Sequence, residues 1–145
     1  MLRAAGPLRC SRSYPGRNGP GHSAEALVVP YQRLLDHLLH AVRGSQAALL
    51  LDAQGELVVE AGARDVRHRL IGAYQGIGLA MAQRTTARFA AGRIDHLVCR
   101  YACGSVILRP LKDGYYLAVH LSSEAILAQA IWHSAKTQAD LDGAL

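Results

Sequence analysis

The apolar positions of this chain switch between a helical period and a strand period several times after Pro30. Apolar residues recur three and four positions apart over residues 27–42, which predicts a helix. A continuous apolar run follows at 47–51 and predicts a strand, and residues 56–60 return as its partner strand. The turn Asp52-Ala53-Gln54-Gly55 lies between them and supplies a glycine for a left-handed backbone. Residues 27–60 therefore read as a helix followed by a tight hairpin.

The rest of the chain continues with a long helix, three strands and a last helix. Apolar residues at helical spacing predict the long helix, and Gly92 interrupts the pattern just after it. Ser122 or Ser123 is expected to cap the last helix, with Ile126 facing inward. The order is α-ββ-α-βββ-α, which describes an α/β sandwich with one mainly antiparallel, five-stranded sheet between helices. The expected long helix and three strands cover residues 64–90, 94–103, 105–111 and 115–121.

Charge is distributed unevenly along the 145 residues. The net charge is +5, but residues 1–23 hold four arginines and no Asp or Glu. The remaining residues carry 12 Lys and Arg against 11 Asp and Glu, so they are close to neutral. We therefore expect a disordered Arg/Gly/Pro-rich tail at 1–23 and one domain at 24–145, without a nucleic-acid surface. A transit peptide and an over-long start assignment are the alternatives for the tail.

The cysteine count and the apolar runs indicate the cellular compartment of the protein. Three cysteines are an odd number, which is not typical of a disulfide scaffold. No run of about 18 apolar residues is present, so no direct membrane insertion is expected. The first residues also lack the continuous apolar stretch of a secretory signal. We expect a cytoplasmic protein, and the high Arg and Ala content favours a bacterial one.

The sequence contains no pattern that indicates catalysis, so the expectation is no enzyme, no cofactor and no metal. There is no G-x-S-x-G elbow and no phosphate loop with a Gly-Lys-Ser/Thr end. Gln75-Gly76-Ile77-Gly78 is similar to part of a dinucleotide fingerprint, but it neither follows a strand nor opens a helix. Cys99 and Cys103 lack a second cysteine pair, so they are interpreted as buried structural thiols. The expected function is to present a surface to another protein.

Two groups of residues are candidates for such a surface. Gly72, Gly76 and Ala80 give the middle helix a face with little side chain, beside Tyr74. A second helix could approach this face closely, or the helix could lie close on its own sheet. The arginines on and after the helix could meet an acidic partner or phosphate, or only be solvated. Arg109, like Arg100, could prevent unwanted strand pairing at a sheet edge, or it could contact a partner. The candidates for partner binding are Arg84, Arg88 and Arg100.

The order of elements and turns resembles the Roadblock family over about residues 27–140. That family has small α-ββ-α-βββ-α domains with a profilin-like sandwich. The resemblance is carried by three segments and by the glycine-bearing helix between the last two. These segments are Leu34-Leu35-Asp36-His37-Leu38-Leu39, Ala47 to Val59 and Val106 to Val119. The chain departs from the family in its tail and in its extra glycines.

The resemblance implies a homodimer in which the middle helices pack together and the sheets join edge to edge. It also implies a small Ras-like GTPase as partner, whose hydrolysis the bacterial relatives of Mgl type promote without inserting an arginine finger. No catalytic residue is carried over. A dynein-light-chain-type adaptor, which links a complex to cargo, is a second hypothesis. A ligand-sensing module of PAS or GAF type, binding haem or a nucleotide, is a third.

Overall fold

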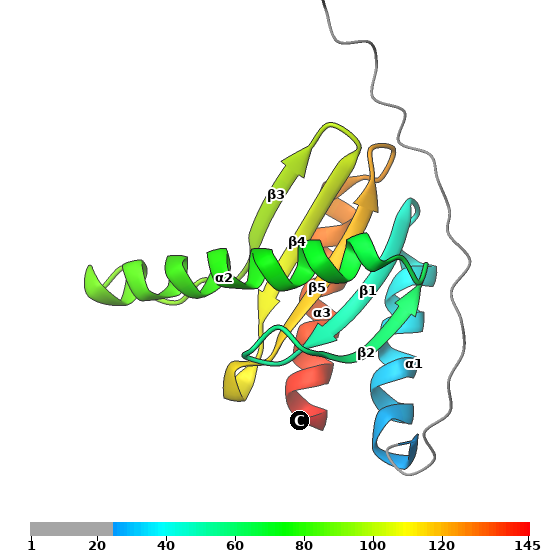
Figure 1. Cartoon of the computed structure of the whole chain (residues 1–145), viewed down its shortest axis with the longest axis horizontal. Helices are drawn as coiled ribbons and strands as arrows, with labels where there is room; N and C mark the ends of the chain where they lie inside the picture. The colour runs from blue at the N-terminus through cyan, green and yellow to red at the C-terminus, as the bar shows by residue number, and fades with distance from the viewer. Residues whose placement is uncertain (1–24) are drawn as a thin grey trace, which may run out of the picture.

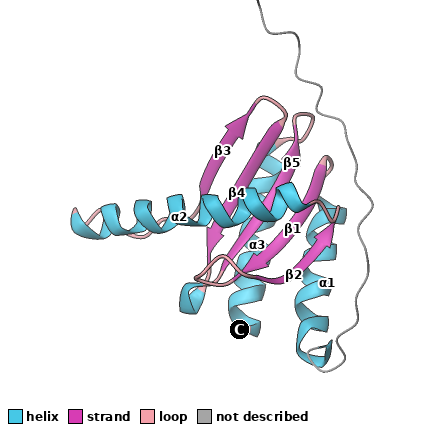
Figure 2. Cartoon of the chain, in the orientation of Figure 1, coloured by secondary structure: helices cyan, strands magenta, loops and turns pink. Residues whose placement is uncertain are grey.

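The computed structural model describes residues 25–145 and shows the expected order of elements (Figure 2). The first helix and the hairpin give way to a long helix, a three-stranded meander and a last helix. A short 3-10 turn, η1 (Lys112–Gly114), links the last two strands. The elements are α1 (Glu25–Ala41), β1 (Ser45–Leu51), β2 (Leu57–Gly62), α2 (Val66–Arg88), β3 (Leu97–Tyr101), β4 (Gly104–Pro110), β5 (Tyr116–Ser122) and α3 (Leu127–Ala144).

The five strands form one sheet in the order β2-β1-β5-β4-β3, and every neighbouring pair is antiparallel. Helix α2 crosses one face of this sheet, while α1 and α3 cover the other face (Figure 1). Strands β1, β5 and β4 lie at the centre and are buried over most of their length. The α/β sandwich expected from the sequence is therefore confirmed.

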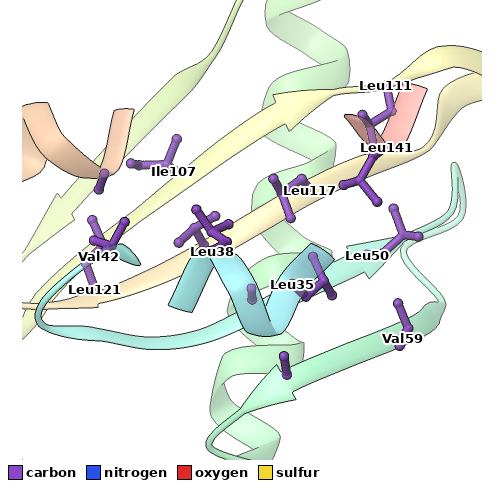
Figure 3. Packing of buried hydrophobic residues seen from close by; sticks show 14 residues of the cluster. Leu35, Leu38, Val42, Leu50, Val59, Ile107, Leu111, Leu117, Leu121 and Leu141 are labelled. Atoms are coloured by element: carbon purple, nitrogen blue, oxygen red, sulfur yellow. The ribbon is translucent and has the colours of Figure 1, made fainter. Parts of the chain in front are cut away.

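The larger core lies between the sheet and the pair α1 and α3 (Figure 3). Leu35 and Leu38 of α1, and Val42 directly after it, are fully buried against the sheet. Leu50 of β1 and Leu117 of β5 meet them from the other side. Burying each of these side chains contributes about 1.5–3 kcal/mol. This core holds α1 and α3 in place independently of α2.

A second, thinner core lies between the sheet and α2. Leu49, Leu51 and Leu108 point to this side of the sheet, together with small residues such as Ala118. From α2, only Gly72 and Leu79 are fully buried. Because the helix contributes so little side chain here, its backbone lies close to the strands.

Two of the three glycines of α2, Gly72 and Gly76, face the chain's own sheet. A Cβ atom on Gly72 would lie 3.6 Å from the Ala118 Cβ. The Tyr116 hydroxyl donates a hydrogen bond of 3.2 Å to the Gly72 carbonyl oxygen, and a Cβ atom on Gly76 would overlap the same hydroxyl. Of the two alternatives for the small-residue face, the structure shows packing within the chain. Gly72 and Gly76 are covered by Tyr116 and the sheet, so they do not face outward toward a second helix.

Some element boundaries and faces differ from the sequence expectation. Strand β3 begins at Leu97 rather than 94, and the loop before it has no strand partner within the described residues. The cap expected from Ser122 or Ser123 is wrong: Ser122 ends β5, and Ile126 occupies the N-cap of α3 without a side-chain hydrogen bond. The inward orientation expected for Ile126 is also wrong, because its side chain is exposed. The turn after β5 is thus longer than the sequence suggests.

Two single substitutions test how close α2 lies to the sheet. Gly76→Ala should lower the free energy of unfolding by about 1–3 kcal/mol, because its methyl group would overlap the Tyr116 hydroxyl. Gly78→Ala is the matched control, since the nearest atom to its added Cβ is the Gln75 Oε1 at 3.8 Å. That change should raise stability by up to about 1 kcal/mol through helix propensity alone. Urea unfolding measures both, and an equal gain in the two variants would contradict the close approach.

Candidate functional site: the outward face of helix α2

The outward face of α2 carries an exposed apolar stripe. Its five large side chains are between 52% and 70% exposed, although the helix packs on a sheet. They recur at spacings of four, four, three and four residues, which places them on one side of an α-helix. Isolated exposed apolar residues are ordinary, but a continuous row of this length is typical of an interaction surface. The stripe consists of Val66, Leu70, Tyr74, Ile77 and Met81.

The direction of the stripe follows from the glycine contact on the other side of α2. Gly72 and Leu79 are buried on the sheet side, and Tyr74 and Ile77 lie roughly half a turn away from them. Tyr74, a predicted dimer residue, therefore points away from the sheet. Ala80, which is also a predicted dimer residue, lies at the side of the helix and is half-buried.

The start of α2 is fixed by a capping interaction and two ion pairs. Asp65 is the N-cap residue, and its carboxylate accepts hydrogen bonds of 2.9 Å from the backbone N–H of Arg67 and 2.7 Å from its guanidinium. The Arg67 side chain thereby holds the pKa of Asp65 below its ordinary value. Arg69 pairs with Glu60 of β2. The basic residues at this end of α2 are thus largely neutralised within the chain.

The predicted partner-binding arginines do not form one group. Arg84 and Arg88 are exposed on α2 and continue the line of the stripe. Arg100 is exposed on β3, two residues after Val98, which packs in the core beneath α1 and α3. Because side chains alternate along a strand, Arg100 lies on the face of the sheet opposite α2. The structure therefore brings Arg84 and Arg88 together and separates Arg100 from them.

Arg109 is a structural residue rather than a surface charge. It lies in β4, inside the sheet, and is only 3% exposed. Its guanidinium donates to Ser134 Oγ at 2.8 Å, to the Ile131 carbonyl at 2.7 Å and to the Asp95 carbonyl at 3.3 Å. Burial lowers the pKa of this guanidinium. Both sequence interpretations of Arg109, edge guard and partner contact, are wrong, because it joins α3 and the loop before β3 to the sheet.

Two histidines meet under the first turns of α2. The rings of His68 and His120 are stacked with centroids 4.6 Å apart. His120 lies in β5 and is fully buried, and neither of its ring nitrogens has a hydrogen-bond partner within residues 25–145. Burial lowers the pKa of His120 to about 3. The ring is therefore neutral at ordinary pH and acts as a packing residue at the α2 contact.

The two cysteines expected to be buried differ from each other. Cys99 is partly buried under α2, and its thiol donates to Gln75 Oε1 at 3.1 Å. Cys103 is exposed in the turn between β3 and β4, so its expected burial is wrong. Within residues 25–145 no group of three or more His, Cys, Asp or Glu side chains is placed to hold a metal ion. None of the helices in the same range is long and apolar enough to cross a bilayer.

Comparison with solved structures identifies the fold. No protein-family model matches the chain, and no curated protein matches it in sequence. A Roadblock/LC7 domain from Streptomyces avermitilis is similar in structure, with a TM-score of 0.68 and 20% identity, over 77% of this chain and 94% of that domain. At such low identity, structural likeness shows a shared fold.

Two MglB structures are similar to the same extent. MglB from Myxococcus xanthus matches with a TM-score of 0.70 and 14% identity, over 79% of this chain and 86% of that one. The gliding protein MglB from Thermus thermophilus matches with a TM-score of 0.73 and 15% identity, over 94% of this chain and 97% of that one. The chain therefore has a Roadblock-type fold, and the fold implied by the sequence resemblance is confirmed.

The buried His120 predicts acid lability with a defined origin. Its pKa is lowered in the folded state, so the unfolded chain binds more protons once the pH falls below the ordinary histidine value of about 6.5. The resulting stability is complete above about pH 6.5 and is lost as the pH falls toward 3, by up to about 1.4 kcal/mol per pH unit. Urea unfolding at several pH values gives the slope of the unfolding free energy against pH. His120→Leu should remove the part of that slope that His120 causes.

His37→Gln is the control for that measurement, because His37 is exposed on α1 and does not touch the buried pair. An unchanged slope in His120→Leu, or an equal reduction in both variants, would show that other groups cause the acid lability.

Proposed function

We propose that this chain is a homodimeric regulator or scaffold of a small Ras-like GTPase, and that the outward stripe of α2 is its dimer contact. The single observation that carries the proposal is the row of exposed apolar side chains on α2 of a Roadblock-type fold. The stripe combines spacings of three and four residues, which keep its side chains on one face, as in helices that pack along a seam. The resemblance described above implies the same middle-helix contact and a GTPase partner.

The dimer is expected to be symmetric and its helices antiparallel. Closed twofold contacts are the commonest form of self-association. An antiparallel pair centred near Tyr74 brings Val66 of one copy opposite Met81 of the other and covers the whole stripe. A parallel pair would instead bring two copies of Arg84 and two of Arg88 together, which is unfavourable for like charges.

The role of the dimer toward a GTPase is regulatory rather than catalytic. The sequence has no phosphate loop for a nucleotide of its own. A regulator changes the state of a GTPase only if it binds one nucleotide form more tightly than the other. The switch segments of such GTPases are ordered by the γ-phosphate and Mg²⁺, so the GTP form offers the better-defined surface. The contribution of this chain is then to order residues that belong to the GTPase.

The dynein-light-chain-type adaptor remains the second candidate, since it uses the same fold and the same dimer. It differs in requiring no preference between nucleotide states. No specific observation within residues 25–145 favours the ligand-sensing module.

A charge placed in the middle of the stripe tests the dimer. Light scattering of the native chain at micromolar concentration should give roughly twice 15.6 kDa. Ile77→Glu should give 15.6 kDa, because a buried, unpaired carboxylate in the seam is strongly unfavourable. Trp132→Glu is the matched control: this tryptophan is 65% exposed but lies on α3, on the other side of the sheet. A monomeric native chain, or a dimer that survives Ile77→Glu, would refute the assignment.

Binding to a Ras-like GTPase encoded next to this chain tests the regulatory role. We expect the form loaded with a GTP analogue to bind at least about tenfold more tightly than the GDP form, as measured by calorimetry. If hydrolysis is accelerated, Arg84→Ala and Arg88→Ala should each retain most of the effect. A loss of about 10³ from one of them would indicate an arginine finger. Equal affinity for both forms would favour the adaptor.

A further inference from the structure

The two sides of the sheet are closed by cores of unequal size. Among the described residues, 14 buried apolar residues form the core beneath α1 and α3, and eight form the core beneath α2. Seven of those eight belong to the strands, so α2 itself supplies only Leu79 within the described range. Local opening of a folded protein occurs where few buried apolar contacts oppose it. Helix α2 is therefore the helix that can leave the sheet while the larger core stays closed.

A titratable side chain lies in the middle of this weaker contact. His120 of β5 is fully buried on the α2 side of the sheet, and a Cβ atom on Gly72 would lie 3.8 Å from its Nε2 atom. The ring of His120 is stacked on the half-buried ring of His68 in the first turn of α2. Neither nitrogen of His120, nor Nδ1 of His68, has a hydrogen-bond partner within residues 25–145. Buried polar atoms without partners are costly, so this part of the α2 contact holds the helix only weakly.

The sheet around His120 offers nothing that would stabilise a positive charge. Its neighbours across the strands are Ala47 of β1 and Val106 of β4, which are both apolar. Two other titratable side chains of the sheet face α2, namely Tyr116 and Cys99. Phenol and thiol groups carry no charge at acid pH, so neither compensates a charged imidazole. A proton on the buried ring of His120 is therefore strongly unfavourable.

The charged groups near the start of α2 do not compensate it either. The Asp65 carboxylate is bonded to the Arg67 guanidinium, and Glu60 of β2 pairs with Arg69. Arg64, in the loop before α2, lies 4.0 Å from the same Glu60 carboxylate. Both carboxylates are thus already neutralised within the chain. A proton on the buried histidine adds a positive charge close to an end of α2 that already carries three arginines.

The closed and open forms of this contact differ in how well they bind a proton. Burial lowers the pKa of His120 to about 3, the charge of His68 lowers it further, and the charge of Asp65 opposes the effect. When α2 leaves the sheet, the ring is hydrated and regains the ordinary histidine pKa of about 6.5. Between these two pH values, each unit of acidification therefore favours the open form by up to about tenfold. Above about pH 6.5 neither form is protonated, and opening no longer depends on this residue.

We propose that the stacked pair of His68 and His120 is a pH-sensitive switch, which releases α2 from the sheet in acid while α1, α3 and the larger core stay folded. The released segment does not persist as a helix, because three interior glycines lower its helical tendency and isolated helices are marginal in water. The switch does not depend on the proposed dimer. If the dimer forms through the stripe, however, acid should also separate the two copies, because the stripe is lost with α2.

Hydrogen exchange read by mass spectrometry separates release of α2 from unfolding of the whole domain. The full-length chain is labelled at pH values from 7 to 4.5, and the most protected amides of 66–88 and 127–144 are compared after correction for intrinsic rates. The protection of 66–88 should fall at least about tenfold between pH 6.5 and 4.5, a range that ends above the ordinary carboxylate pKa values. Constant protection of 66–88 over this range would overturn the proposal.

The same measurement on Ile77→Glu excludes protection that α2 gains from dimer pairing. In that chain, 66–88 should be at least about tenfold less protected than 127–144 at every pH, because α2 opens without the larger core. Equal protection of the two segments would show a single all-or-none transition and would refute the switch.

Substitution of the buried histidine tests whether it is the proton acceptor. His120→Leu should reduce the fall in protection of 66–88 from at least about tenfold to less than about twofold. His120→Phe keeps an aromatic ring against His68 and replaces the leucine variant if that chain does not fold. His37→Gln, on the exposed side of α1, is the control and should behave as the native chain does. A native response in both His120 variants, or an equal loss in the control, would overturn the proposal.

Light scattering over the same pH range distinguishes the switch from the proposed function. A dimeric native chain should shift from roughly twice 15.6 kDa toward 15.6 kDa as 66–88 loses protection, and His120→Leu should remain a dimer at pH 4.5. A chain that is monomeric at every pH would refute the dimer, whereas the exchange result would still decide the switch. A dimer that persists while 66–88 is fully exchanged would refute the stripe as the dimer contact and leave the switch standing.

Discussion

The close contact between α2 and the sheet determines what this molecule shows to its surroundings. Gly72 and Gly76 let the helix backbone settle on β5, where the Tyr116 hydroxyl meets the Gly72 carbonyl at 3.2 Å. An α-helix has about 3.6 residues per turn, so fixing one side of α2 fixes the opposite side as well. With glycines inward, the large apolar residues must point outward. Side chains that would form a core in an ordinary amphipathic helix become a surface instead.

The same contact explains why the fold could be read from the sequence but the orientation of α2 could not. Period-two and helical patterns, with turns such as Asp52 to Gly55, indicate the element order and the antiparallel sheet. Periodicity shows that a helix has an apolar side, but it does not show where that side points. The usual rule places it inside, whereas here Tyr74 and Ile77 are exposed and Gly72 is buried. Only the position of Tyr116 in the neighbouring strand reveals this reversal, and sequence spacing does not place Tyr116 against Gly76.

The sequence also did not reveal how two polar residues are buried in the sheet. Arg109 and His120 sit in strands whose patterns gave no sign of how each side chain is accommodated. Among the described residues no carboxylate contacts Arg109; instead, neutral oxygens of α3 and the loop before β3 accept its hydrogen bonds. His120 is buried without such acceptors in the same part of the chain and stays neutral against His68. One polar residue thus anchors α3 and the other lies beneath α2, on opposite faces of one sheet.

Exposed and buried arginines therefore have opposite roles in this chain. The cost of removing a guanidinium from water is offset for Arg109 by several hydrogen bonds within the domain. Arg84 and Arg88 are exposed and keep their hydration. Because they continue the line of the apolar stripe, the glycine contact that turns Ile77 outward also turns these arginines outward. A rotation of α2 by one residue, roughly 100° about its axis, would displace the apolar stripe and these two arginines together. The outward direction of the apolar stripe and of these arginines thus depends on the same two glycines, although both glycines face the sheet.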